Sequence, residues 1–78
     1  MSDIKDQIRG AILEKIPDGN ITVEAGSGGH FTIAVVSPVF AGKSMVESQR
    51  LVYGAIAHLM KGDGAPVHAV DKLTTKTP

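Results

Sequence analysis

The chain has 78 residues with no cysteine, and its 8 basic and 8 acidic side chains give a formal net charge of zero. This length predicts a single domain over residues 1–78, with room for one small sheet and a few helices. The balanced charge disfavours broad electrostatic binding of nucleic acid, and the lack of cysteine excludes disulfides, thiolate catalysis and all-cysteine metal sites. Any soft metal ligand of this chain must therefore be a histidine.

Neither a membrane span nor a secretory signal is expected from the sequence. No apolar run approaches the roughly 20 residues that cross a bilayer. The N-terminal segment MSDIKDQIRG mixes charged and apolar side chains and lacks the continuous apolar core of a signal peptide. We expect a cytoplasmic protein that does not contact a membrane.

The first part of the chain predicts a helix followed by a hairpin. From Ser2 to Ile16, apolar residues recur at the spacing of an amphipathic helix, and the turn at 17–20 ends it. Residues 21–25 alternate between apolar and polar side chains, whereas Phe31–Val36 is β-branched and apolar on both faces. Two strands joined by the glycine-rich turn 26–29 fit this pattern best.

A long helix is expected in the second half. Ser37-Pro38 ends the second strand, because proline cannot donate to a strand ladder, and a short turn or helix around 38–42 follows. Ser44 and Glu47 have the spacing of a capping box. A wide apolar face then predicts a helix from Met45 to Met60.

The C-terminal segment predicts one more strand, from Val67 to Leu73, and a tail from Thr74 to Pro78 that frays. The expected order is helix, strand, strand, short turn or helix, long helix, strand. So few elements form a core only if the two long helices cover one face of a three-stranded sheet. The sequence therefore predicts an α+β fold.

The Gly42-Lys43-Ser44 triplet resembles the end of a phosphate-binding loop, but the rest of that motif is missing. The motif requires a second glycine five residues before its last one, and here that position is Ser37. Pro38 also removes an amide donor from the loop. The favoured interpretation is that Gly42 makes a turn and Ser44 caps the helix.

A helix that follows a short turn also raises the possibility of a helix-turn-helix reader of DNA. The first turn of this helix, MVESQ, contains one acid and no base, and Lys43 and Arg50 are the only nearby cations. A reader needs several phosphate contacts before base edges matter. Nucleic-acid binding is thus disfavoured but stays open, with Lys43 and Arg50 as candidate contacts.

Histidine is the remaining side chain able to carry chemistry, and the chain has three. His58 lies within the long helix, where a structural or exposed histidine is the more common case. His30 and His68 lie at the starts of two predicted strands, where a sheet can present two imidazoles to solvent together. No His-Glu-x-x-His zinc motif is present.

Three segments, GGHF (28–31), VVSPVFAGKSMVESQRLVYGAI (35–56) and VHAV (67–70), resemble the BolA family. In that family histidine-phenylalanine opens the second strand, phenylalanine-x-glycine-x-serine precedes a helix bearing leucine-valine-tyrosine, and histidine-alanine lies in the last strand. The match covers nearly the whole chain in the right order. It implies an αββααβ fold similar to the type II KH arrangement, with a mixed three-stranded sheet.

The resemblance also implies a non-enzymatic adaptor in iron-sulfur trafficking or iron regulation. BolA-like proteins pair with monothiol glutaredoxins and share a bridged [2Fe-2S] cluster, to which the glutaredoxin gives a cysteine and glutathione a second thiolate. The BolA-like side gives a histidine of the last strand, which His68 matches, and a histidine or cysteine of the hairpin region. Imidazole is a competent iron ligand, as Rieske centres show.

The second ligand follows less directly from the resemblance. In longer family members it lies inside an extended hairpin loop, whereas Gly26–Gly29 is short and carries none. His30 is nominated because it is the only ligand-type side chain nearby. No cluster is expected in the isolated chain.

The alternative function is a transcriptional regulator that binds nucleic acid through the KH-like fold. A homodimer is compatible with either function.

Overall fold

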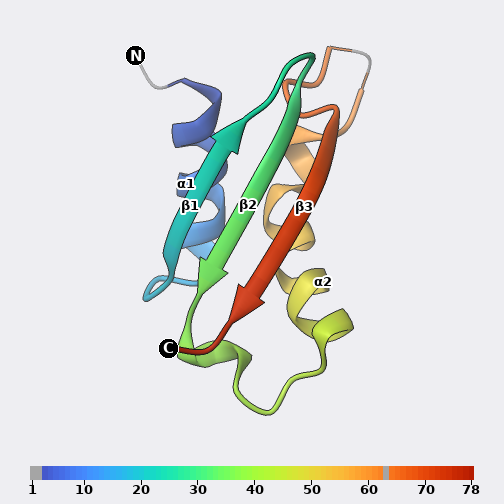
Figure 1. Cartoon of the computed structure of the whole chain (residues 1–78). Helices are drawn as coiled ribbons and strands as arrows, with labels where there is room; N and C mark the ends of the chain where they lie inside the picture. Colours follow the sequence, from blue (N-terminus) through green and yellow to red (C-terminus); the bar gives the residue numbers. More distant parts are fainter. Residues whose placement is uncertain (1–2, 63) are drawn as a thin grey trace.

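The computed structural model describes residues 3–62 and 64–78. Along the chain lie α1 (Ile4–Lys15), β1 (Asn20–Ala25), β2 (His30–Val36), the 3-10 helix η1 (Pro38–Phe40), α2 (Met45–Ile56), the 3-10 helix η2 (Ala57–Leu59) and β3 (Ala69–Lys76), as Figure 1 shows.

The three strands form one mixed sheet in the order β1-β2-β3. β1 and β2 are antiparallel partners joined by the predicted hairpin turn, whereas β2 and β3 are parallel. Parallel neighbours need a long crossover connection, which α2 and the two 3-10 helices supply. The predicted mixed sheet is confirmed, with β2 at its centre.

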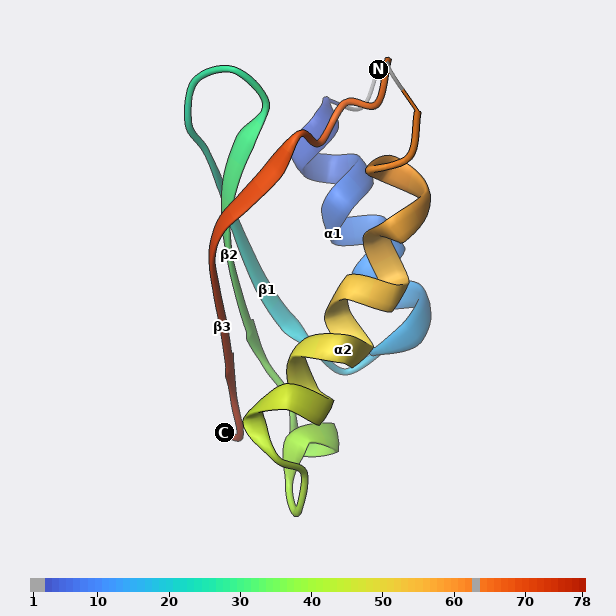
Figure 2. The ribbon, with the colours of Figure 1, turned by 90° about the vertical axis from the view of Figure 1, so that its right-hand side faces the viewer.

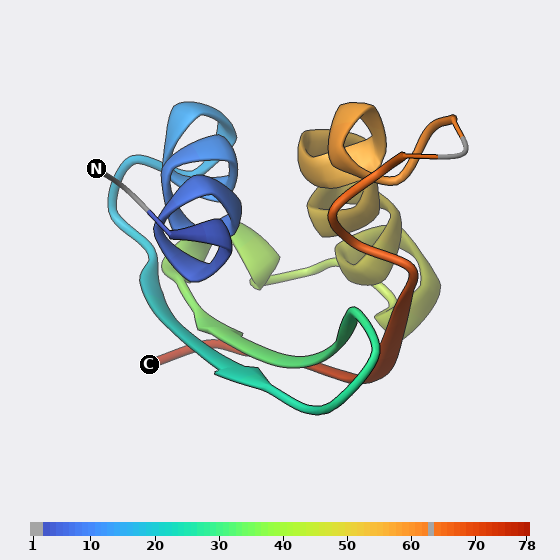
Figure 3. The same ribbon diagram turned by 90° about the horizontal axis from the view of Figure 1, so that it is seen from above.

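Both α-helices lie against the same face of this sheet, and no helix formed by the described residues lies on its other face (Figures 2 and 3). Along β2, Phe31, Ile33 and Val35 are buried while the residues between them are more exposed. This alternation follows from the period of two in a β-strand and directs the three apolar side chains toward the helices. The core residues from the helices are Ile8, Ile12, Val52, Ala55 and Ile56.

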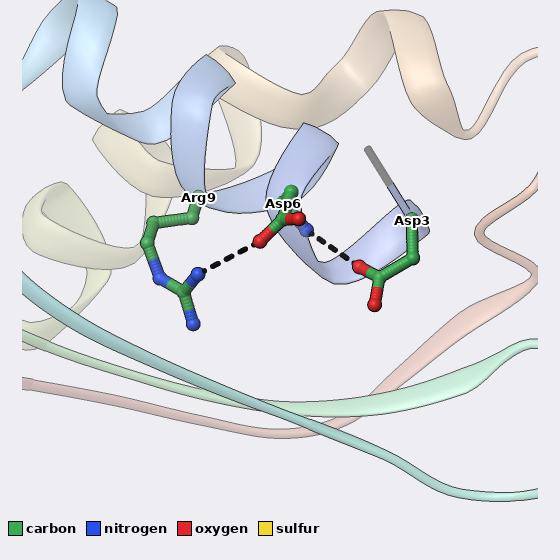
Figure 4. Close-up of polar contacts among 3 residues, drawn as sticks. All are labelled: Asp3, Asp6 and Arg9. Atoms are coloured by element: carbon green, nitrogen blue, oxygen red, sulfur yellow. Dashed lines mark hydrogen bonds and ion pairs between the residues drawn. The ribbon is translucent and has the colours of Figure 1, made fainter. Parts of the chain in front are cut away.

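Helix α1 begins where Asp3 caps it. The Asp6 amide donates to the Asp3 Oδ1 carboxylate oxygen at 3.0 Å, and Arg9 Nη1 donates to Asp6 Oδ1 at 3.1 Å (Figure 4). The sequence predicted a start at Ser2, which lies outside the described residues. At the other end Ile16 has left helical geometry and serves as the C-cap.

Helix α2 begins with the predicted capping box. The Ser44 Oγ accepts from the Glu47 amide at 3.1 Å, and Glu47 Oε1 accepts from the Ser44 amide at 3.2 Å. The predicted end at Met60 is too late, because the helix stops at Ile56 and the chain tightens into η2, a common ending for α-helices. Among the described residues, no helix is long and apolar enough to cross a membrane.

The last strand differs most from its prediction. It was expected over Val67–Leu73 but runs from Ala69 to Lys76, so the expected fraying of Thr74–Pro78 is wrong for most of that tail. Residues 74–76 pair with 34–36 of β2, and the Ser37 amide donates to the Lys76 carbonyl at 2.9 Å. Pairing with the central strand holds this polar segment in the sheet, and no local sequence pattern indicates that pairing.

Candidate functional site

His68 lies directly before β3 and is tied to the hairpin turn between β1 and β2. The amides of His68 and Ala69 both donate to the Gly29 carbonyl, at 2.9 and 3.2 Å. A β-carbon added to Gly29 would come within 3.0 Å of His68 Cγ, so the imidazole lies against this turn. The turn and the start of β3 therefore meet at one end of the sheet, as Figure 1 shows.

His30 opens β2 at the same end. It is the register partner of Ala69, the residue after His68, so the parallel pairing places the backbones of both histidines at the same end of the sheet. His30 is exposed, and the strand alternation directs its side chain away from the buried Phe31, onto the face that carries no helix. The predicted position of both histidines at strand starts is thus observed, while their role as metal ligands stays a prediction.

The imidazole of His30 has a carboxylate partner that the sequence did not reveal. Its Nδ1 lies 2.8 Å from Asp71 Oδ1, and the side chains of His30 and Asp71 are 47% and 57% exposed. The only local signal was an acid three residues after His68, in a strand that also carries Lys72. That signal does not say which residue the acid contacts.

An irregularity in β3 brings Asp71 to this position. Phe31 pairs with Val70 and Thr32 with Lys72, so Asp71 is an extra residue between two regular pairs. Such a bulge re-aims side chains, and here it leaves Asp71 and Lys72 both exposed while Val70 and Leu73 pack against the core.

A hollow of about 310 Å³ lies beside His68. Its other lining residues are Met60, Gly62, Ala65 and Val67, from the segment between η2 and β3. His68 thus borders a depression whose other described lining residues are uncharged.

The other predicted contacts lie elsewhere. Lys43 and Arg50 line a hollow of about 360 Å³ with Glu47 and Leu51 at the start of α2, away from the hairpin turn (Figures 1 and 2). The hollow includes an acid: the pKa of Glu47 is lowered because its carboxylate accepts a hydrogen bond from the Ser44 backbone and lies near Lys43. Its charges are thus mixed.

The remaining predicted residues have structural positions. Gly42 adopts φ +77°, the left-handed conformation that glycine allows, and Ser44 caps α2, so the GKS triplet is a turn and a cap. His58 lies on η2 and is exposed.

A [2Fe-2S] cluster takes four protein or thiol ligands. The described part of the chain contains no group of three or more His, Cys, Asp or Glu that could hold a metal ion. It does place two exposed histidines at one end of the sheet. This donor set fits part of a cluster's ligand shell, with the remaining ligands coming from other molecules.

The order α1, β1, β2, η1, α2, β3, with both α-helices on one face of a mixed sheet and η1 as the short helix before α2, defines the αββααβ class of small domains that resembles type II KH domains. Within that class the chain belongs to the BolA family, because the family model described as BolA-like protein matches residues 14–78.

Similar proteins agree with this assignment. The chain is 43% identical to mouse BolA-like protein 1 over 60 residues, which make up 77% of this chain and 41% of the mouse protein. The solved structure of BolA1 from Arabidopsis thaliana superposes with a TM-score of 0.81 at 24% identity, covering 100% of this chain and 95% of that one. The BolA domain of SufE1 from Arabidopsis thaliana superposes with a TM-score of 0.79 at 28% identity, covering 100% of this chain and 95% of that domain.

Proposed function

We propose that this protein is a cytoplasmic, non-enzymatic adaptor that binds a monothiol glutaredoxin and shares a [2Fe-2S] cluster with it and with glutathione. The adaptor would serve iron-sulfur trafficking or iron regulation. The observation that supports the proposal is that the backbones of His68 and His30 lie at the same end of the sheet, through the bonds of His68 and Ala69 to Gly29 and the pairing of His30 with Ala69.

His68 and His30 are the residues that would hold the cluster on this side. Both are exposed, so a partner can approach them without the fold opening. Imidazole ligates iron in Rieske centres, where histidines replace two cysteines at one iron. When bound, the cluster would supply iron and sulfide for transfer.

The chain needs a partner because its own donors are too few. It has no cysteine, and the part described by the structure offers no group of three or more metal-ligating side chains. Thiolates from a glutaredoxin and from glutathione would complete the ligand shell. The other described residues that line the hollow beside His68 are uncharged, which suits such a contact, since the centre of an interface is poor in charged residues.

The test is reconstitution of the protein with a monothiol glutaredoxin, glutathione, ferrous iron and sulfide. We expect a mixed complex by size-exclusion chromatography, with a visible circular dichroism spectrum different from that of the glutaredoxin alone. The isolated chain, treated in the same way, serves as the control and should stay colourless. A glutaredoxin spectrum unchanged by this protein, or a stable brown form of the chain alone, would contradict the proposal.

The alternative of a nucleic-acid-binding regulator has no specific support from the charge distribution. The chain has no net charge, and the hollow bordered by Lys43 and Arg50 also contains Glu47. Salt separates the two functions, because affinity for nucleic acid falls steeply as salt rises. A coordinated cluster should persist over the same range.

A further inference from the structure

We infer that Asp71 is a positioning residue that holds His30 in the tautomer protonated on Nδ1, so that Nε2 is free to bind a metal. The inference rests on the proposed function for its biological meaning, since His30 is there a cluster ligand. The contact between His30 and Asp71 itself does not depend on that function.

The first argument is the geometry of the contact. His30 Nδ1 lies 2.8 Å from Asp71 Oδ1, the distance of a strong hydrogen bond. An ionised carboxylate only accepts hydrogen bonds, so a neutral imidazole in this contact carries its proton on Nδ1. The bond made by one ring nitrogen determines the state of the other, which leaves Nε2 with a free lone pair.

The second argument comes from metal sites in general. A histidine that binds a metal almost always donates its other ring N–H to a carboxylate, a carbonyl or water. That bond fixes the ring orientation and raises the basicity of the ligand. The contact between His30 and Asp71 is of this kind, on a histidine whose side chain is 47% exposed.

The third argument is that the strand departs from regular pairing where this contact is made. Asp71 is the extra residue of a bulge in the edge strand β3, and bulges occur preferentially at sheet edges and beside functional sites, where they re-aim a side chain. Without the extra residue, the strand period would direct the residue after Val70 outward and the next one inward. The bulge instead makes Asp71 and Lys72 both exposed and keeps Leu73 packed against the core.

The contribution of the His30–Asp71 pair to the stability of the fold is too small to explain why the pair is present. Both side chains are about half exposed, and surface pairs of this kind contribute little to folding. Lys72 is the nearest charged residue along the chain, and it does not bond Asp71 among the salt bridges of the described residues. The carboxylate of Asp71 is therefore committed to His30.

The first experiment reads the tautomer in the free protein. Long-range proton–nitrogen correlation spectra of ¹⁵N-labelled protein, in mildly alkaline buffer, distinguish protonation on Nδ1 from protonation on Nε2. We expect His30 to be protonated on Nδ1 in the wild type and to move toward the other tautomer in Asp71→Ala. Asp71→Glu should restore the original signal, because it returns a carboxylate to an exposed position.

The matched control is Glu24→Ala, which removes an exposed carboxylate from β1, on the same sheet, and should leave the His30 tautomer unchanged. The second experiment measures cluster loss from the mixed complex with glutaredoxin. Removal of a ligand's outer-shell partner typically costs 10- to 100-fold in metal affinity. We therefore expect Asp71→Ala to lose the cluster about tenfold faster than the wild type, with Asp71→Glu between the two and Glu24→Ala unchanged.

Different results would overturn the role of Asp71 and the proposed function. An unchanged His30 tautomer in Asp71→Ala overturns the role of Asp71, whether or not a cluster forms. A cluster lifetime that shortens in His30→Ala but not in Asp71→Ala overturns it as well. If the wild-type mixture forms no shared cluster, the proposed function fails, and the tautomer experiment alone decides whether Asp71 positions His30.

Discussion

The imidazole of His68 lies against the α-carbon of Gly29, and the two residues are also joined through the backbone. The His68 amide donates to the Gly29 carbonyl at 2.9 Å, and a β-carbon on Gly29 would stand only 3.0 Å from His68 Cγ. Gly29 also has φ +79°, a backbone conformation that residues other than glycine rarely adopt. This position therefore requires glycine both for its backbone conformation and for the place of the histidine.

The first prediction is that Gly29→Ala displaces His68. The positive φ should cost about 1 to 2 kcal/mol of stability, measured by urea unfolding. In addition, the new methyl group should shift the ring resonances of His68, because the imidazole must move away from it.

Gly28→Ala is the matched control for this substitution. Gly28 has φ +69°, but an added β-carbon would meet only His30 Cδ2, at an ordinary 3.9 Å. This variant should lose a similar amount of stability while the His68 resonances stay in place. Equal His68 shifts in the two variants would contradict the crowding argument.

The second prediction concerns His68→Ala. The side chain is exposed and lies outside the buried core, so the free energy of unfolding should change by about 0.5 kcal/mol or less. The mixed complex with glutaredoxin should show an altered visible circular dichroism spectrum and lose its cluster at least about tenfold faster, since a direct ligand matters no less than its outer-shell partners. His58→Ala, an exposed histidine on η2, is the control. An unchanged spectrum and lifetime in His68→Ala would make this histidine structural.

The third prediction is that Ser44→Ala destabilises the protein by about 1 kcal/mol, the usual cost of losing an N-cap. The Ser44 hydroxyl accepts from the Glu47 amide at 3.1 Å, and alanine leaves that amide without this partner. Thermal or urea unfolding measures the loss, with Lys43→Ala as a neighbouring variant of little expected effect. ATP should not bind to either variant or to the wild type. Saturable ATP binding lost in Lys43→Ala would revive the phosphate-loop interpretation.

The fourth prediction is that the stability contributed by the capping box of Ser44 and Glu47 depends on pH. The pKa of Glu47 is lowered in the folded protein, first by the hydrogen bond from the Ser44 backbone, then by the Ser44 side chain and by the charge of Lys43. A lowered folded-state pKa means that the carboxylate stabilises the fold above its unfolded-state pKa and loses this effect as pH falls through the folded-state pKa.

Comparison with Glu47→Gln checks the direction of this pH dependence, because glutamine can still close a capping box but does not titrate. Urea unfolding of both proteins from neutral to acidic pH should show the wild type more stable at neutral pH. Its advantage should shrink on acidification. An advantage that grows toward acidic pH would show that the sign is wrong.

The fifth prediction tests the length of β3. A chain ending at Leu73 loses residues 74–76, which pair with β2, and the bond from the Ser37 amide to the Lys76 carbonyl. At about 1 kcal/mol for each lost hydrogen bond, stability should fall by roughly 2 kcal/mol or more. A chain ending at Lys76 removes only Thr77 and Pro78, which lie beyond the strand, and should unfold like the wild type. Equal stability of the two truncations would contradict the pairing.

Local patterns were sufficient for the elements whose contacts are close in sequence. The capping box joins Ser44 to Glu47 three residues away, and the apolar spacing of α1 depends only on neighbouring turns. The hairpin turn likewise joins adjacent strands. Helices, hairpin and cap could therefore be predicted with errors of a few residues at their ends, such as the end of α2.

The sequence by itself thus determined the type and order of the elements and the presence of two histidines at strand starts. The tertiary structure decided how far β3 extends and where its bulge lies, because both depend on pairing with a strand some forty residues earlier. The contact between His30 and Asp71 spans a sequence separation of 41, and the contact between Gly29 and His68 depends on the same parallel pairing. No local pattern encodes such contacts, since they form only when the crossover through α2 brings β3 beside β2.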